Sequence, residues 1–167
     1  MASCVATLHE SFGTRATGVI RRATVKDAEA IHALLWTAKD DIPLKDHFSN
    51  DIYRGWVREQ CRKRNFWIVE RDDQLAGAMM MQVDEIRYLV TAAAHRKARF
   101  AQALIEHAKE QVRKKYRSGV WAQVKPSNMP IIRLLEKLNF VRDPDRVAPG
   151  DWICYCSSEA DRIMARH

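Results

Sequence analysis

An apolar strand, a short loop and a basic amphipathic helix follow one another in the middle of the chain, and this succession constrains the fold most. The strand is expected over Glu85–Val90, the loop over Thr91–Ala94 and the helix over His95–Tyr116. A loop that runs directly into a helix leaves backbone N–H groups unpaired, and the helix dipole favours an anion beside them. The succession therefore predicts an α/β scaffold with a turn suited to an anion, and a solvated basic helix face is the alternative for the same residues.

Short strands and amphipathic helices are expected on both sides of this segment. The further helices are predicted over Thr24–Ala38, Asp46–Arg64 and Pro130–Leu138. The further strands are predicted over Val19–Ala23, Phe66–Glu70, Leu75–Val83, Val120–Val124, Phe140–Val141 and Trp152–Ser157. The expected fold is a single-domain, mixed α/β arrangement in which about four helices flank a mostly antiparallel sheet of six to seven strands.

Three local signals support these boundaries. Thr24 is an N-cap candidate with an acidic residue, Asp27, three positions later. The polar run Arg71–Gln74 predicts a hairpin turn between two strands. Asn139 stands where a helix is expected to end in a left-handed residue, a conformation that asparagine tolerates.

Length and composition are those of one globular domain. The chain has 167 residues, of which 47% are hydrophobic and 29% charged. We expect a flexible tail over residues 1–18, the folded domain over 19–160 and a C-terminal tail over 161–167. No apolar stretch is long enough for a transmembrane helix and no signal peptide is apparent, which predicts a cytoplasmic protein without membrane attachment.

The four cysteines lack the spacing of a metal site. Cys154 and Cys156 are the only close pair, and no second pair or histidine cluster accompanies them. We therefore expect free, buried thiols and no bound metal.

Three motifs, in the correct order, resemble those of the GNAT acetyltransferases. The run Ile20–Thr24 with Asp27 resembles the opening strand and helix of that family. The segment Leu89–Leu104 resembles its acyl-CoA motif, and Asn128 followed by Leu134–Phe140 resembles its later Asn…Leu-Tyr-Glu-Lys-Leu-Gly-Phe signature. The resemblance implies a GNAT-like fold, acetyl-CoA as acyl donor and an amine as acceptor.

The acyl-CoA motif departs from the family pattern at its centre. In Arg/Gln-x-x-Gly-x-Gly/Ala, Arg96 matches the first position and Ala101 the last, whereas Arg99 replaces the central glycine. We expect Arg99 to be helical and to point outward, so that the amides remain available to a pyrophosphate; the alternative is that its Cβ crowds the phosphates. The donor-binding residues that the resemblance implies are Leu89, Val90, Arg96, Lys97, Ala98, Arg99, Phe100, Ala101 and Asn128.

The resemblance also assigns candidates for proton transfer. Glu85 stands eleven residues before Arg96, as the general base does in histone-acetyltransferase-like members, although an ordinary exposed carboxylate is an equal alternative and Asp84 a second candidate. The family's tyrosine acid is replaced by Leu135, so Tyr155 on a late strand is the substitute candidate, with Cys156 as another. Thiolate release without a protein acid is a further alternative.

Two functional classes remain open at this level. The first is an N-acetyltransferase that moves an acetyl group from acetyl-CoA to a primary amine by direct transfer in a ternary complex. The second is a GNAT-like module, inactivated at Arg99 and Leu135, that binds a nucleic acid or protein. A net charge of +7 and the basic run Tyr53–Trp67 make an anionic or nucleic-acid-linked acceptor a minor hypothesis. A homodimer is left open.

Overall fold

The computed structural model describes residues 6–7, 18–40, 49–96, 98–116 and 119–157. These residues form two compact units. Unit 1 contains the described residues up to Met80 together with Tyr88–Leu104, and unit 2 contains Met81–Arg87 together with the described residues from Ile105 onward. The chain passes from one unit to the other inside β4 (Gln74–Gln82), β5 (Glu85–Thr91) and α3 (Phe100–Tyr116), so these three elements contribute to both.

Antiparallel strands form the sheet of unit 1. Its strands are β1 (Ala6–Thr7), β2 (Val19–Arg22), β3 (Phe66–Arg71), β4 (Gln74–Gln82) and the second half of β5 (Glu85–Thr91). The pairs β1–β2, β2–β3 and β3–β4 are all antiparallel. Asp72 and Asp73 connect β3 to β4 with φ angles of 51° and 59°. Two consecutive left-handed residues are the signature of a tight hairpin loop, which confirms the predicted turn.

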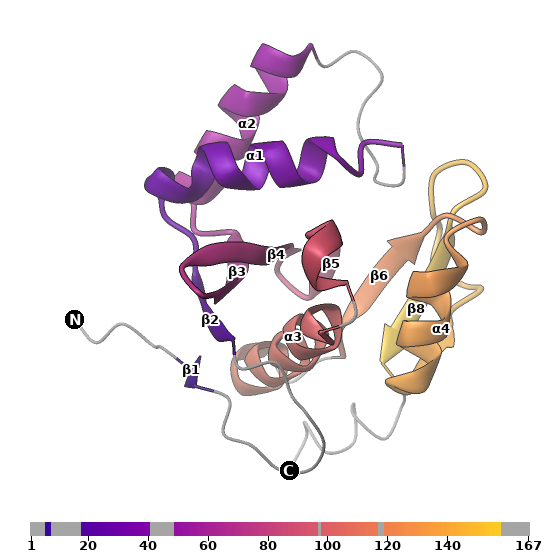
Figure 1. The fold of residues 1–167 in the computed structure, drawn as a ribbon. Helices are drawn as coiled ribbons and strands as arrows, with labels where there is room; N and C mark the ends of the chain where they lie inside the picture. Colours follow the sequence, from indigo (N-terminus) through magenta and orange to yellow (C-terminus); the bar gives the residue numbers. More distant parts are fainter. Residues whose placement is uncertain (1–5, 8–17, 41–48, 97, 117–118, 158–167) are drawn as a thin grey trace. The chain divides into compact units, whose positions relative to one another are not determined.

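Helices α1 (Ala28–Trp36) and α2 (Asn50–Arg62) lie side by side and cover one face of this sheet (Figure 1). Their apolar residues pack with alternate residues of β3 and β4, so that Leu35, Val57, Ile68 and Ala78 belong to one buried cluster. A 3-10 turn, η1 (Val25–Asp27), precedes α1. Packing of two amphipathic helices on a sheet is the arrangement that the hydrophobic spacing of both segments predicts.

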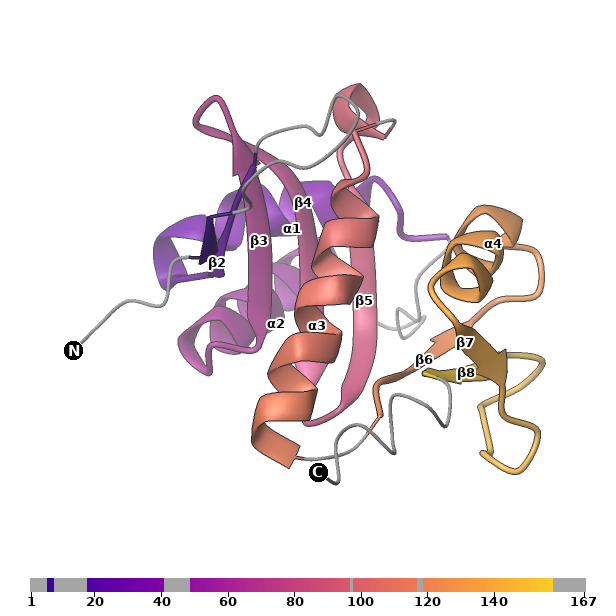
Figure 2. The same ribbon diagram turned by 90° about the horizontal axis from the view of Figure 1, so that it is seen from below.

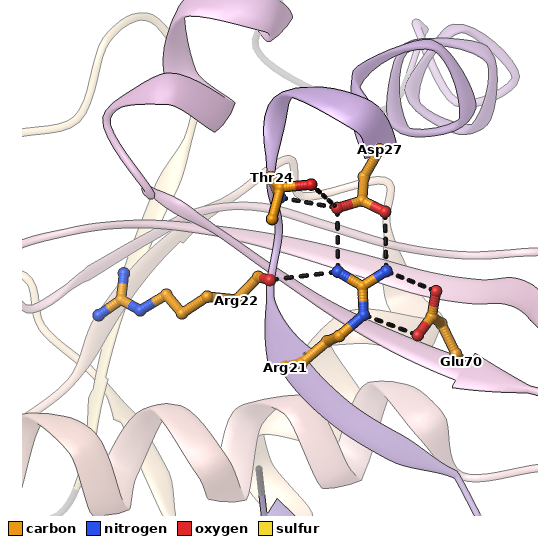
Figure 3. Close-up of polar contacts among 5 residues, drawn as sticks. All are labelled: Arg21, Arg22, Thr24, Asp27 and Glu70. Atoms are coloured by element: carbon orange, nitrogen blue, oxygen red, sulfur yellow. Dashed lines mark hydrogen bonds and ion pairs between the residues drawn. The ribbon is translucent and has the colours of Figure 1, made fainter. Parts of the chain in front are cut away.

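An ion-pair network joins the start of α1 to the sheet (Figure 3). The Arg21 guanidinium contacts both carboxylate oxygens of Asp27, at 2.7 and 2.9 Å, and both of Glu70, at 2.6 and 2.7 Å. The backbone N–H and the hydroxyl of Thr24 also donate to Asp27. Thr24 is the N-cap of the 3-10 turn η1, at the position that the sequence predicts for a helix start, whereas Asp27 is the N-cap of α1 itself. Arg21 fixes the exit from β2 by bidentate contacts to two elements.

Unit 2 is built on a second group of strands (Figure 2). The strand β6 (Trp121–Val124) pairs in parallel with Glu85 and Ile86 of β5 and antiparallel with β8 (Ile153–Ser157), which in turn pairs antiparallel with β7 (Phe140–Arg142). Helix α4 (Met129–Lys137) precedes β7 and packs against it. Asn139 separates them with a φ of 63°, which confirms the predicted left-handed helix end.

The predicted fold class is confirmed. Among the described residues there are four α-helices and, apart from the two-residue β1, seven strands, most of them antiparallel. Cys61, Cys154 and Cys156 are buried thiols, as expected, whereas Cys4 lies outside the described residues. No described helix is long and apolar enough to cross a membrane.

The expected tails fall mainly outside the described residues. Within the predicted N-terminal tail, residues 6–7 form β1 and pair with β2. The predicted C-terminal tail, 161–167, lies entirely outside the part of the chain that the structure describes.

Candidate functional site

Helix α3 (Phe100–Tyr116) begins five residues later than predicted. The segment before it forms tight turns: a 3-10 turn, η2 (Ala93–His95), is followed by a bond from the amide of Ala98 to the carbonyl of His95 at 3.0 Å. The prediction that one helix continues from His95 is therefore wrong. The helix cannot extend backward because the residue that precedes it, Arg99, has left-handed dihedrals.

Arg99 has a φ of 59°, which corrects the prediction that it is helical. Its carbonyl accepts the amide of Ala103 at 3.0 Å, so it caps α3 instead of continuing it. A left-handed conformation costs a non-glycine residue about 1–2 kcal/mol. The backbone at this position therefore takes the conformation for which glycine is best suited, while the Arg99 side chain is exposed to solvent, as expected.

The first turn of α3 combines the amides of a helix N-terminus with positive charge. Ala103 is bonded to Arg99, whereas the amides of Phe100 and Ala101 precede the first bond of the helix ladder. Arg96 is exposed beside the same turn. Lys97, another predicted donor-binding residue, lies outside the described residues. A turn with these properties attracts a phosphate group through the helix dipole and through the guanidinium groups.

Phe100 anchors this turn to the sheet. Its side chain is 2% exposed. A Cβ atom added to Gly18 would lie 2.8 Å from the Phe100 ring and 2.8 Å from the Val69 side chain, so a glycine is needed for their close packing. The His95 ring contacts Phe100 edge-on, with centroids 5.8 Å apart. The turn before α3 is thus held by packing on both sides of Arg99.

The end of β5 leads into this turn. Leu89 is half-buried and Val90 is buried in the cluster beneath α1 and α2. The amide of Ala92 donates to the carbonyl of Ala76 at 2.9 Å. A Cβ at Gly77 would lie 3.2 Å from the Val90 carbonyl oxygen, so the absence of a side chain lets β4 approach this part of β5 closely.

Glu85, the predicted base, lies in unit 2 and is 8% exposed. Burial raises the pKa of its carboxyl group above the ordinary value, and the nearby Arg87 opposes this without cancelling it. Arg87 Nε donates to Glu85 Oε2 at 3.0 Å. Asp84, the second candidate, accepts the indole N–H of Trp121 at 3.0 Å. The alternative that Glu85 is an ordinary exposed carboxylate does not agree with this burial.

Tyr155 and Asn128 also lie in unit 2. The Tyr155 hydroxyl donates to Glu136 Oε1 at 3.3 Å, and burial raises the pKa of Tyr155 above its ordinary value. Leu135, which stands where the family has tyrosine, is buried in the core. Asn128 is half-buried at the N-cap of α4, and its carbonyl accepts the amide of Ile132 at 3.2 Å.

Acidic side chains accompany the basic residues of α2. Arg54 and Arg58 contact Glu29 of α1 at 3.2 and 4.0 Å, and Arg62 and Lys63 pair with Glu59. A nucleic-acid surface requires positive charge that is available to phosphates. These pairs agree better with a charged, solvent-exposed outer face of α2 than with a nucleic-acid surface.

A group of aromatic rings between α1, α2 and β5 was not anticipated from the sequence. Each ring contacts the next in the order Trp36, Tyr53, Trp56, Tyr88. The three distances between ring centroids are 6.0, 5.5 and 5.5 Å. The i, i+3 spacing of Tyr53 and Trp56 was a signal for the middle contact. The contacts with α1 and β5 depend on tertiary packing.

The comparisons with known proteins agree with this geometry. The model of the acetyltransferase (GNAT) family matches residues 28–140. No curated protein matches the chain in sequence. The structure of an N-acetyltransferase from Staphylococcus aureus Mu50 is similar with a TM-score of 0.65 and 16% identity, over 82% of this chain and 98% of that protein.

Two further similar structures contain coenzyme A. The diaminobutyrate acetyltransferase EctA from Paenibacillus lautus, solved with L-2,4-diaminobutyric acid and coenzyme A, has a TM-score of 0.61 and 17% identity, over 84% of this chain and 94% of its own. The PaiA N-acetyltransferase from Thermoplasma acidophilum, solved with coenzyme A, has a TM-score of 0.61 and 16% identity, over 85% of this chain and 99% of its own. At these identities the similarity establishes the fold.

Proposed function

The chain belongs to the acetyltransferase (GNAT) family, and from that membership we propose that it transfers an acetyl group from acetyl-CoA directly to a primary amine in a ternary complex. The observation that carries the proposal is the backbone at Arg99. Its positive φ and exposed side chain agree with a phosphate-binding turn that has kept its shape without glycine. Inactivation of the turn by a crowding Cβ is the alternative that this observation disfavours.

Binding of the donor would use two parts of unit 1. The amides of Phe100 and Ala101 and the charges of Arg96 and Arg99 are suited to the pyrophosphate. Lys97 and Ala98 belong to the same motif. Backbone groups of Leu89 and Val90 would hold the pantetheine arm and polarise the thioester carbonyl. Asn128 is the donor-binding residue proposed in unit 2.

The chemistry requires one proton acceptor and one leaving group. The neutral amine attacks the thioester carbonyl carbon, the C–S bond breaks with its electron pair on sulfur, and the amine nitrogen loses a proton as the amide forms. Glu85 is proposed to take that proton, directly or through water, because burial has raised the pKa of its carboxyl group toward the working pH. Tyr155 is proposed to protonate the departing thiolate, because a phenol carries its proton in neutral solution.

The experiment that tests the proposal has two readouts. Acetyl-CoA should raise the Tm of the protein in a concentration-dependent way, because a ligand that binds only the folded state stabilises it. Free CoA thiol should then appear when a panel of primary amines is supplied. The absence of both effects would overturn the proposal. Salt-sensitive binding to polyanions without a shift by acetyl-CoA would favour the inactive binding module instead.

A further inference from the structure

The turn between β4 and β5 places Asp84 directly before Glu85, and Trp121 of β6 holds this turn in two ways. The backbone amide of Trp121 donates to the Asp84 carbonyl at 3.0 Å. The indole N–H of Trp121 donates to Asp84 Oδ1, also at 3.0 Å. Glu85 and Trp121 are paired residues of the parallel strands β5 and β6. One tryptophan therefore fixes both the backbone and the carboxylate of the residue that precedes the proposed base.

Val83, in the same turn, has an unfavourable backbone conformation. Its φ is 59°, in the left-handed region, where a β-branched residue is rare because its side chain clashes with the backbone. Val83 is 61% exposed, so packing of its side chain does not explain this conformation. Such strain persists only where surrounding contacts impose it, and it is concentrated at functional sites. The two hydrogen bonds from Trp121 to Asp84 are contacts of this kind, directly beside the strained residue.

Arg146 covers the Trp121 ring and holds it in place. The guanidinium carbon lies 4.2 Å from the ring centroid, which is the geometry of a cation–π contact. Arg146 Nε also contacts Asp143 Oδ2 at 3.6 Å, and the amide of Asp143 donates to the carbonyl of Cys154 at 2.9 Å. All of these residues belong to unit 2. The indole is therefore held by the turn at Asp84 and by the segment that joins β7 to β8.

The charged and titratable side chains near Glu85 come from several segments of unit 2. Burial is the largest influence on the pKa of Glu85 and raises it. The positive charges of Arg87 and Arg146 lower this pKa, whereas the negative charge of Asp84 raises it. Cys154 of β8 is also close enough for Glu85 to affect its ionisation. Asp84 is thus an acidic neighbour whose position beside Glu85 adds to the effect of burial.

From this geometry we propose that Trp121 is a positioning residue for acetyl transfer, which acts on Glu85 through Asp84. The inference rests on the proposed function, in which Glu85 is the base. The hydrogen bond from the indole keeps the Asp84 carboxylate beside Glu85 and occupies it, so that Asp84 is not the base. The fixed turn orients Glu85, and the negative charge of Asp84 makes Glu85 the stronger proton acceptor.

The first readout is the pKa of Glu85 itself. Protein with isotope-labelled carboxyl carbons is titrated by NMR, and the Glu85 signal is assigned from its loss in Glu85→Gln. Asp84→Asn should lower the pKa of Glu85 by about 0.5, because a neighbouring negative charge is lost while the amide oxygen still accepts the indole N–H. Trp121→Phe should also lower it, because the released Asp84 carboxylate turns toward water, which screens its charge.

The double variant separates this specific contact from a general change of structure. Asp84→Asn should change the pKa of Glu85 less than about half as much in the Trp121→Phe background as in the wild type. An equal change in both backgrounds would overturn the inference. Trp152→Phe is the matched control, because the Trp152 ring also lies under a cation of unit 2, Lys125. It should leave the pKa of Glu85 unchanged, and a shift equal to that of Trp121→Phe would also overturn the inference.

The second readout is the rate of CoA release from acetyl-CoA with a fixed mixture of butylamine, benzylamine, L-lysine and spermidine. Trp121→Phe should lower this rate about tenfold without changing the KM for acetyl-CoA, because the base is misplaced while the donor turn is intact. Asp84→Asn should retain the rate within about threefold. Asp84→Ala, which removes the hydrogen bond as well as the charge, should be as slow as Trp121→Phe.

The Asp84 variants also decide the case in which Trp121→Phe does not fold, because they alter a half-buried turn position instead of a tryptophan. Asp84→Ala should then be about tenfold slower than Asp84→Asn, and equal rates of these two variants would overturn the inference.

The outcomes distinguish this inference from the proposed function. If Asp84→Asn loses as much activity as Glu85→Gln, Asp84 is the base, and the inference is overturned while the proposed function stands. If acetyl-CoA raises the Tm but none of the four amines releases CoA, the pKa of Glu85 in the double variant decides the inference. If acetyl-CoA neither raises the Tm nor releases CoA, the proposed function fails and the inference fails with it.

Discussion

Arg87 Nε donates a hydrogen bond to Glu85 Oε2 at 3.0 Å, from two residues further along the same strand. Two opposing effects act on the Glu85 carboxyl group. Burial favours the protonated form and raises its pKa, whereas the positive charge of Arg87 favours the carboxylate. Burial is the larger effect, so the net pKa lies above the ordinary 4.5. A carboxylate with a raised pKa is the stronger base.

The first prediction concerns Glu85→Gln. Glutamine is close in size to glutamate but cannot accept the proton, so we expect kcat to fall by about 10²–10⁴. In the wild type, kcat/KM should fall as the pH drops through the raised pKa of Glu85, and this acidic limb should be missing in the variant. The increase in Tm caused by acetyl-CoA should persist. Equal kinetics of the two proteins across pH would remove Glu85 from the mechanism.

A second prediction follows from the same hydrogen bond. Arg87→Met removes the cation that lowers the pKa of Glu85, so that pKa should rise further and the acidic limb of kcat/KM should move to higher pH. Arg133→Met, in an exposed position of α4, is the matched control for loss of one positive charge. If the acidic limb of kcat/KM shifts by the same amount in Arg87→Met and Arg133→Met, the shift is a general effect of lost positive charge and the prediction is wrong.

The hydrophobic pattern of the chain predicted most elements because packing determines them. The hydrophobic pattern predicted two helices before β3, and their apolar residues Leu35 and Val57 do pack on the sheet. Asp27, three positions after Thr24, marked a real helix start. These features depend on neighbours in the chain or on a simple division between buried and exposed faces. They can therefore be recognised without knowledge of the fold.

The conformation of Arg99 could not be predicted in this way. Arginine is a good helix former, and the residues around it continue a helical pattern. The left-handed residue instead stands next to Phe100, whose burial beside Gly18 is a tertiary feature. The burial of Glu85 and the ring contacts of Trp56 with Tyr88 likewise arise from residues distant in sequence.

The third prediction concerns Arg99→Gly. Glycine removes a left-handed strain of about 1–2 kcal/mol but makes the unfolded chain more flexible by about 0.5–1 kcal/mol. The free energy of unfolding should therefore rise by between about 0 and 1.5 kcal/mol. Acetyl-CoA should still bind, with a Kd raised severalfold at low salt because one cation near the phosphates is lost, and less at high salt.

Arg99→Ala is the control for Arg99→Gly, because it removes the same charge but keeps the Cβ atom. Both variants should weaken acetyl-CoA binding to the same extent in calorimetric titrations, and Arg99→Ala should be the less stable to urea. A complete loss of binding in Arg99→Gly would show that the guanidinium, and not the backbone of the turn, holds the donor.

The last prediction concerns the stability that Asp27 provides. Its side chain is 15% exposed, and hydrogen bonds from Arg21 are the main reason that its pKa is lowered from 3.8 to about 2. A carboxyl group whose pKa is lower in the folded state stabilises the protein above the unfolded pKa, and this contribution is lost as the pH falls through the folded value. At about 1.36 kcal/mol per pKa unit, the contribution at pH 7 is roughly 2 kcal/mol.

Asp27→Asn should therefore lower the free energy of unfolding by about 2 kcal/mol at pH 7, and the difference from wild type should shrink as the pH falls from about 4 toward 2, where the wild type also becomes neutral at this position. Urea unfolding at several pH values measures this. Asp72→Asn is the control, since Asp72 is exposed at a left-handed turn position that asparagine also tolerates. The free energy of unfolding of Asp72→Asn should stay within about 0.5 kcal/mol of the wild-type value. A difference for Asp27→Asn that is the same at pH 7 and pH 3 would mean that Asp27 stabilises the start of α1 through its shape and not through its charge.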